Sequence, residues 1–173
     1  MKKILFLVIF ITSVVLDFIS KSFVVDYFKN SDTHFVPVIK NFLNIGLTFN
    51  EGVAFGFMTT WSPNVRLFAL IVTSVIAFSV LLYFLFVVYR DNKIAVAFLA
   101  LIFGGAVGNI IDRFRYGAVV DFIDIYYKQY HWPMFNLADS FICIGVFVLI
   151  FLPHETKEIT KVEMDVDMGK DIK

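Results

Sequence analysis

Four long apolar runs alternate with polar segments along the 173-residue chain. They cover residues 4–25, 65–89, 94–112 and 135–152. A helix of about 20 apolar residues is long enough to cross the hydrocarbon core of a bilayer. The pattern predicts an all-α membrane protein with four transmembrane helices, the fourth short but sufficient.

The first apolar run begins like a secretory signal peptide, because Lys2 and Lys3 precede it. No small-x-small cleavage site follows, so we expect an uncleaved first helix. Asp17 and Lys21 lie in this run at spacing i, i+4 and share one helix face. Two interpretations stay open: a tolerated ion pair near the helix end, with Lys21 extending toward water, or support for an active site.

The segment between the first two runs has a different period. Apolar side chains alternate with polar or small ones from Leu43 to Asn50, which predicts a strand with one apolar face. Glu51-Gly52 is a turn signal, and residues 53–58 are typical of a second strand. We expect a small β-sheet at about residues 30–60, outside the hydrocarbon core, facing the membrane surface or a lipid-like ligand. The residues after this strand have small side chains, which would let another chain or ligand approach the backbone closely. The alternative interpretation is an ordinary hairpin turn. These residues are Asn50, Gly52, Ala54 and Gly56.

The segment at about residues 114–135 is too polar to span a bilayer. Its tyrosines and Trp132 are typical of the membrane–water interface, so we expect an interfacial segment. Residues 154–173 carry mixed charge and few apolar side chains, which predicts a flexible tail. The expected organisation is one four-helix membrane domain, residues 1–153, followed by this tail.

Lysine and arginine predict the orientation. The N-terminus, the connection at 89–93 and the tail hold Lys2, Lys3, Arg90, Lys93, Lys157, Lys161, Lys170 and Lys173. The other two connections hold only Lys29, Lys40, Arg113, Arg115 and Lys128. By the positive-inside rule, both termini and the tail are expected to be cytoplasmic.

Composition agrees with a membrane protein and narrows its chemistry. The chain is 59% hydrophobic, above the 45–50% of typical soluble domains. Its formal net charge is zero, so there is no electrostatic case for nucleic acid. The single Cys143 excludes an internal disulfide, and the three histidines lack zinc-ligand spacing. We expect no metal and no cofactor.

The unusual polar residues gather at one end of the predicted bundle. Asp17 is expected toward the outer end of the first helix, Asn109 and Asp112 end the third, and Asn136 and Asp139 open the fourth, with Asp121 in the connection between. A charge inside the bilayer costs about 2.5–3.5 kcal/mol on insertion scales. Gly104 and Gly108 would let a neighbouring helix pack closely. A shared depth near the extracytoplasmic surface therefore predicts a functional site.

The residue types favour an aspartic dyad. Two carboxyl groups can divide one proton, so that one activates water and the other polarises a carbonyl. Asp121 and Asp139 are our candidate pair, although Asp124 rivals Asp121 and Asp112 rivals either. Asp112 has the adjacent Arg113 as a candidate ion-pair partner. The Asn136–Asp139 spacing also fits a plain helix cap. A small proton-coupled transporter or a channel subunit is the alternative class, but a transporter would need its polar groups at the midplane.

At these residues the chain resembles lipoprotein signal peptidase, or signal peptidase II. The matching stretches are Asp17-x-x-Ser20-Lys21, Asn50-x-Gly52-x-Ala54-Phe55-Gly56, Gly104-Gly105-x-x-Gly108-Asn109-x-x-Asp112-Arg113, Val120-Asp121-Phe122 and Phe135-Asn136-x-Ala138-Asp139. They follow the family's order over residues 17–142. Phe18 departs from the family, whose members often carry a polar residue there.

The resemblance implies a bacterial aspartic endopeptidase of the cytoplasmic (inner) membrane, with Asp121 rather than Asp124 paired to Asp139. It implies that Asn50, Asn109, Arg113 and Asn136 support the site, near Asp17 and Lys21. The implied substrates are prolipoproteins carrying diacylglycerol, cut just before the lipidated cysteine. A monomer working in membrane lipid and sensitive to globomycin-like peptide antibiotics is also implied.

Overall fold

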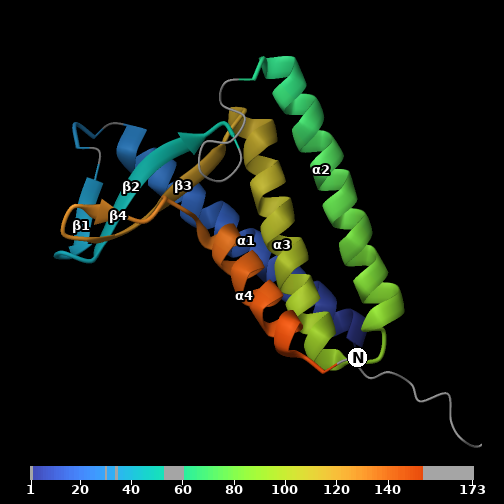
Figure 1. Cartoon of the computed structure of the whole chain (residues 1–173). Helices are drawn as coiled ribbons and strands as arrows, with labels where there is room; N and C mark the ends of the chain where they lie inside the picture. The colour runs from blue at the N-terminus through green and yellow to red at the C-terminus, as the bar shows by residue number, and fades with distance from the viewer. Residues whose placement is uncertain (1, 30, 34, 53–60, 154–173) are drawn as a thin grey trace, which may run out of the picture.

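The computed structural model describes residues 2–29, 31–33, 35–52 and 61–153. Four helices run side by side, and a small sheet projects from one end of them (Figure 1). The elements are α1 (Lys2–Lys29), β1 (Phe35–Ile39), β2 (Leu43–Asn50), α2 (Pro63–Tyr83), the π-helical η2 (Phe84–Val88), α3 (Lys93–Tyr116), β3 (Val119–Tyr127), β4 (Tyr130–His131) and α4 (Leu137–Phe151). The strand expected at 53–58, Ala54 and the tail at 154–173 lie outside the described residues.

Among the described residues, three helical segments are long and apolar enough to cross a membrane. They are α1 with 28 residues, residues 64–88 with 25, and α3 with 24. The apolar α4 has 15 residues and is shorter. The chain is therefore a multi-pass membrane protein, and a fourth membrane span by α4 stays a prediction.

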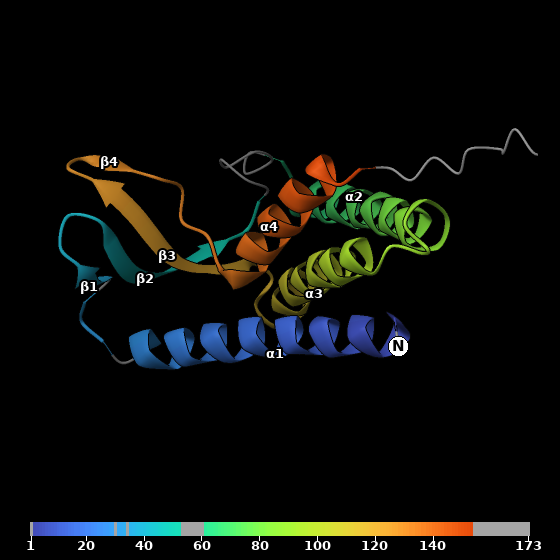
Figure 2. The same cartoon turned by 90° about the horizontal axis from the view of Figure 1, so that it is seen from below.

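Glycines bring α1 and α4 close to the central helix α3. A side chain at Gly104 would collide with Ser13 of α1, and one at Gly105 would meet the Ala138 carbonyl of α4. Helix α2 stands further from the others, as two perpendicular views show (Figures 1 and 2). A mostly apolar groove of about 450 Å³ lies between α2 and α3 and is lined at one end by Arg113.

Helix α1 is longer than expected and reaches the sheet. It ends at Lys29, so Asp17 lies near its middle and not toward its end. Val24 and Phe28, in the last turns of α1, form a small core with Phe122 of β3. This contact with the sheet explains the extra length, since the buried face of α1 is polar at Asp17 and Lys21 and becomes apolar only at Val24 and Phe28.

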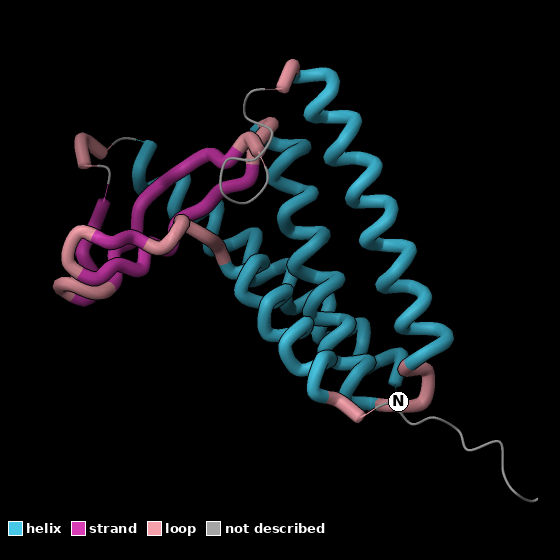
Figure 3. Tube along the Cα trace, in the orientation of Figure 1, coloured by secondary structure: helices cyan, strands magenta, loops and turns pink. Residues whose placement is uncertain are grey.

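The segment at 114–135 is not simply interfacial, because it contains β3 and β4. The sheet is antiparallel in the order β1-β2-β3-β4, and Figure 3 shows the strands together beside the helices. Strand β3 is rich in β-branched and aromatic residues, which favour strands. Two aspartates in this strand give the segment a polar composition. The prediction that Asp121 lies in a loop is therefore wrong, because Asp121 is part of β3. Strand β1 was also not predicted.

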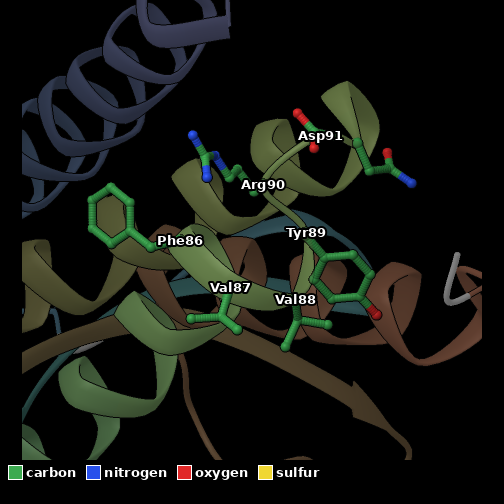
Figure 4. A pocket seen from close by; sticks show the side chains of 7 residues that line it. Phe86, Val87, Val88, Tyr89, Arg90 and Asp91 are labelled. Atoms are coloured by element: carbon green, nitrogen blue, oxygen red, sulfur yellow. The ribbon is translucent and has the colours of Figure 1, made fainter. Parts of the chain in front are cut away.

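The opposite end of the bundle holds the α2–α3 connection. In η2 the Tyr89 N–H donates to the Phe84 carbonyl, five residues back. Tyr89 is buried and its hydroxyl donates to the Leu149 carbonyl of α4. A hollow of about 350 Å³ lies beside this turn and is lined by residues 86–92 (Figure 4). Lys2 forms an ion pair with Asp91, so the start of α1 lies next to this connection.

Candidate active site

Strand β3 presents the first candidate carboxylate, Asp121, to the helix bundle. Its side chain is buried, and each oxygen accepts one amide hydrogen bond. Asn50 at the end of β2 donates to Oδ2 (3.0 Å), and Asn136, before α4, donates to Oδ1 (2.8 Å). The pairing of β2 with β3 brings Asn50 beside Asp121, because Thr48 is opposite Asp121 in the register.

The first turn of α4 presents the second candidate carboxylate, Asp139. Asn136 and Asp139 form a capping box: the Asp139 N–H donates to Asn136 Oδ1 (2.9 Å), and the Asn136 N–H donates to Asp139 Oδ2 (3.3 Å). Asn109 of α3 donates its amide to Asp139 Oδ1 (2.8 Å). Asn136 therefore caps the helix and also hydrogen bonds to both candidate carboxylates, so the two interpretations of its spacing are compatible.

The amide orientations follow from chemistry. Each asparagine oxygen faces a group that can only donate: Asn50 Oδ1 accepts from the Gly52 N–H, Asn136 Oδ1 from the Asp139 N–H, and Asn109 Oδ1 from Lys21 Nζ. Each amide nitrogen is thereby turned toward a carboxylate. The site is a pair of aspartates held by three amides of fixed direction.

A buried ion cluster lies behind this pair. Lys21 Nζ is 2.7 Å from Asp17 Oδ2 and 2.9 Å from Asp112 Oδ2. Lys21 is fully buried, so the expectation that it extends toward water is wrong. Asp17 also accepts from the Ala138 N–H (2.9 Å), and Gly108 leaves the space that Asp17 occupies. Lys21 is held inside the protein by these two carboxylates and by Asn109 Oδ1 at 2.9 Å.

Arg113 lies close to the site without the ion pair expected for it. Among the described residues, Asp112 pairs with Lys21 instead and accepts from the Val120 N–H (3.1 Å). Arg113 Nη1 donates to the Asn109 carbonyl (3.2 Å). The Arg113 guanidinium also acts electrostatically on Asp139, Asp112 and Asp121. It therefore supplies positive charge to the same group of carboxylates.

Asp124 is separated from this group. It lies three residues beyond Asp121 on a strand, where side chains alternate between faces. Its carboxylate accepts from Asn44 Nδ2 (2.8 Å) and bonds His131 Nδ1 (2.7 Å), and the His131 ring stacks on Tyr126. No motif in the sequence indicates this second cluster, because its members come from three different strands.

The environment of Asp121 favours its protonated form. Burial raises the pKa of Asp121 to about 6, against an ordinary value of 3.8, and the charge of Asp139 adds to the rise. The amides of Asn50 and Asn136 oppose it. Two neighbouring carboxyl groups titrate as a pair, so the raised pKa of Asp121 is consistent with one proton held at this site.

Some site features have no signal in the sequence. The backbone of Val120 donates to Asp112 and accepts from Asn136 Nδ2 (3.2 Å), joining the ion cluster to the amides. A backbone contact of this kind leaves no residue type to recognise. In the described part of the chain, no three His, Cys, Asp or Glu side chains are grouped as a metal site.

Comparison with known proteins gives a consistent result. A family model described as signal peptidase (SPase) II matches residues 9–153. The lipoprotein signal peptidase of Geobacter sulfurreducens is 46% identical over 114 residues, 66% of this chain and 70% of that protein. That of Syntrophotalea carbinolica is 39% identical over 137 residues, 79% of this chain and 83% of that one. A bacterial membrane enzyme solved by the in meso method at 2.3 Å is similar in structure, with a TM-score of 0.69 and 34% identity over 84% of each chain.

Proposed function

The chain belongs to the signal peptidase II family, and we propose that it removes the signal peptide from diacylglyceryl-modified prolipoproteins by an aspartate dyad. Membership makes it a membrane-bound peptidase of lipoprotein processing. The aspartic mechanism, the cleavage point just before the lipidated cysteine and the residue roles are the proposed part.

The amide network around Asp121 and Asp139 is the observation that carries this proposal. Asn136 hydrogen bonds to both carboxylates, so the two groups belong to one site. Asp139 would take a proton from water as the water oxygen attacks the scissile carbonyl carbon. Protonated Asp121 would donate to the carbonyl oxygen. The intermediate would then break its C–N bond as Asp139 gives its proton to the leaving cysteine nitrogen, and Asp121 would take its proton back from the new carboxyl group.

The apolar surroundings fit a lipid-modified substrate. The groove between α2 and α3 is lined mainly by apolar side chains of α2 and ends at Arg113, next to the carboxylates. Acyl chains held there would keep the scissile bond at the depth of the dyad and supply proximity. The edge of the sheet near Asn50 would bind the peptide by strand addition.

We also propose the orientation of the protein in a bacterial inner membrane. Both termini lie on the cytoplasmic side, and the dyad lies near the extracytoplasmic face. The lysine and arginine bias supports this, as does the Lys2–Asp91 ion pair, which joins the N-terminus to the basic α2–α3 connection. Residues 1–153 act as one catalytic domain, and a monomer is sufficient because all proposed groups come from one chain.

The experiment is a cleavage assay with protein reconstituted in vesicles. One substrate is a precursor peptide whose cysteine carries diacylglycerol, and its matched control is the same peptide without lipid. The lipidated peptide should be cut much faster, should give a product that begins at the modified cysteine, and should be protected by a globomycin-like antibiotic. Equal rates for both peptides, or a product cut elsewhere, would contradict the proposal.

A further inference from the structure

The three amides around the candidate carboxylates are not anchored in the same way. Asn50 and Asn136 are oriented by backbone N–H groups, of Gly52 and Asp139. Asn109 is oriented by a side chain, because its Oδ1 accepts from Lys21 Nζ at 2.9 Å. A backbone donor cannot be removed by a simple substitution, whereas a lysine can. Asn136 Nδ2 also donates to Asn109 Oδ1, at a longer 3.3 Å, so Lys21 gives the shorter, charged hydrogen bond of the two that orient the Asn109 amide.

The position of Lys21 is itself fixed. The side chain is fully buried, and its ammonium lies between Asp17 (2.7 Å) and Asp112 (2.9 Å). Asp17 is held by the Ala138 N–H, and Asp112 by the Val120 N–H. The ammonium therefore forms ion pairs with two buried carboxylates and donates a hydrogen bond to the Asn109 oxygen. The ammonium cannot turn away from Asn109 without leaving a buried carboxylate unpaired.

We infer that Lys21 is a positioning residue for the reaction: it holds the Asn109 oxygen, so that the Asn109 N–H stays on Asp139 Oδ1. This inference rests on the proposed function. An N–H donor at Oδ1 stabilises negative charge on the Asp139 carboxylate, the form that a general base needs. If the amide turned over, its carbonyl oxygen would face the carboxylate and repel the anion. Asp139 would then hold a proton more readily and could not act as the base.

The charged groups around Asp139 come from three elements. Lys21 and Asp17 belong to α1, Asp112 and Arg113 to α3, and Asp121 to β3. Arg113 acts on Asp139 through its charge and does not depend on Lys21 for its bond to the Asn109 carbonyl. Removing Lys21 therefore leaves the Arg113 interaction in place, and the Asn109→Ala background separates the effect on the amide from the loss of the Lys21 charge.

The test is a double-mutant cycle of Lys21→Met and Asn109→Ala, with rates on the lipidated precursor divided by the amount of folded protein. Lys21→Met should lower kcat by about 100-fold, with KM unchanged, because a misplaced group near the reacting atoms has this cost. The acid limb of its kcat profile should move to higher pH. In the Asn109→Ala background the same change should cause no further loss, since Lys21 acts through Asn109. Lys29→Met, at the exposed end of α1, is the matched control and should behave as wild type.

A second variant guards against a folding defect. Lys21→Met leaves two carboxylates beside each other, so the double variant Asp17→Asn/Lys21→Met removes one charge, while the introduced amide oxygen can still accept from the Ala138 N–H. It should show the same loss of kcat and the same shifted profile. An unchanged kcat, an unchanged acid limb, additive losses in the cycle, or loss of the fold in both variants would overturn the positioning role. If the wild-type protein did not cut the lipidated precursor, the proposed function itself would fail.

Discussion

Two buried aspartates on strand β3, Asp121 and Asp124, have closely matched partners and different neighbours. Each accepts a hydrogen bond from an asparagine of β2, Asn50 for Asp121 and Asn44 for Asp124. Both carboxylates are nearly inaccessible to solvent, at 3% and 1% exposed. The difference lies in the second partner. Asp121 faces the bundle and a second carboxylate, whereas Asp124 faces His131 on the exposed hairpin.

This comparison shows that burial alone does not separate the proposed catalytic carboxylate from the other aspartate of the strand. Asp124 has the His131 ring beside it, 2.7 Å from its carboxylate, and within the described residues none of its hydrogen-bond partners is a second carboxylate. Asp121 has the like charge of Asp139 nearby, which favours one shared proton. Protons are exchanged most readily where the charged and neutral forms are close in free energy. The like-charged neighbour, and not the depth, distinguishes the two positions.

The largest expected effect tests which aspartate takes part in the reaction. Asp121→Asn and Asp139→Asn should each lower cleavage by about 10⁴-fold or more, at the scale seen for triad residues, because an amide cannot exchange the proton. Asp124→Asn is the matched control on the same strand and should keep most of the activity. Initial rates on the lipidated precursor, at equal folded protein, measure all three. Activity in Asp121→Asn together with loss in Asp124→Asn would show that the two positions are exchanged.

The helices were easier to predict from the sequence than the sheet. Long apolar runs give a strong signal, and the structure has helices at all four predicted positions. Strand β2 followed from its period of two, but β3 was missed because Asp121 and Asp124 break its apolar pattern. These aspartates are tolerated since each finds an amide donor on β2, a contact between segments about 70–80 residues apart.

The sequence indicates which residues belong to the candidate site, but it does not predict the contacts between them. The spacing of Asp17 and Lys21 predicts an ion pair, which the structure contains. No spacing indicates that Lys21 would reach Asn109, or that Asp112 would pair with Lys21 in preference to Arg113. These contacts depend on the register between α1 and α3, which Gly104 and Gly108 set by their lack of side chains. Asp121 and Asp139 as the catalytic pair stay a prediction.

A smaller effect is expected on stability as the pH changes. The pKa of Asp121 is raised by folding from 3.8 to about 6, so the folded state binds this proton more tightly than the unfolded state. The contribution of Asp121 to the free energy of unfolding is therefore greatest below about pH 4, and it is lost as the pH rises through about 6. At about 1.4 kcal/mol for each pH unit, the loss is at most roughly 3 kcal/mol.

Unfolding free energies in detergent at several pH values measure this loss. The decrease in unfolding free energy that Asp121 causes between about pH 4 and pH 6 should be present in the wild type and in Asp124→Asn, and absent in Asp121→Asn. Other carboxyl groups contribute to the pH dependence of all three proteins. The contribution of Asp121 is therefore the difference between the wild-type curve and the Asp121→Asn curve. Parallel curves for the wild type and Asp121→Asn would mean that Asp121 is not the group that holds the proton.

The smallest expected effect compares the two asparagines of β2, which donate equivalent hydrogen bonds to the two aspartates. Asn50→Ala removes one of the two amide donors of Asp121, so it should lower kcat by about tenfold, near the value of one hydrogen bond to a charged group. Asn44→Ala removes the matching donor from Asp124 and should leave kcat unchanged, while lowering the free energy of unfolding by about 1–3 kcal/mol. The same truncation on one strand thus separates a catalytic environment from a structural one. If both variants lost stability equally and neither lost activity, Asp121 and Asp124 would have the same structural role, and the like charge of Asp139 would not be the decisive difference.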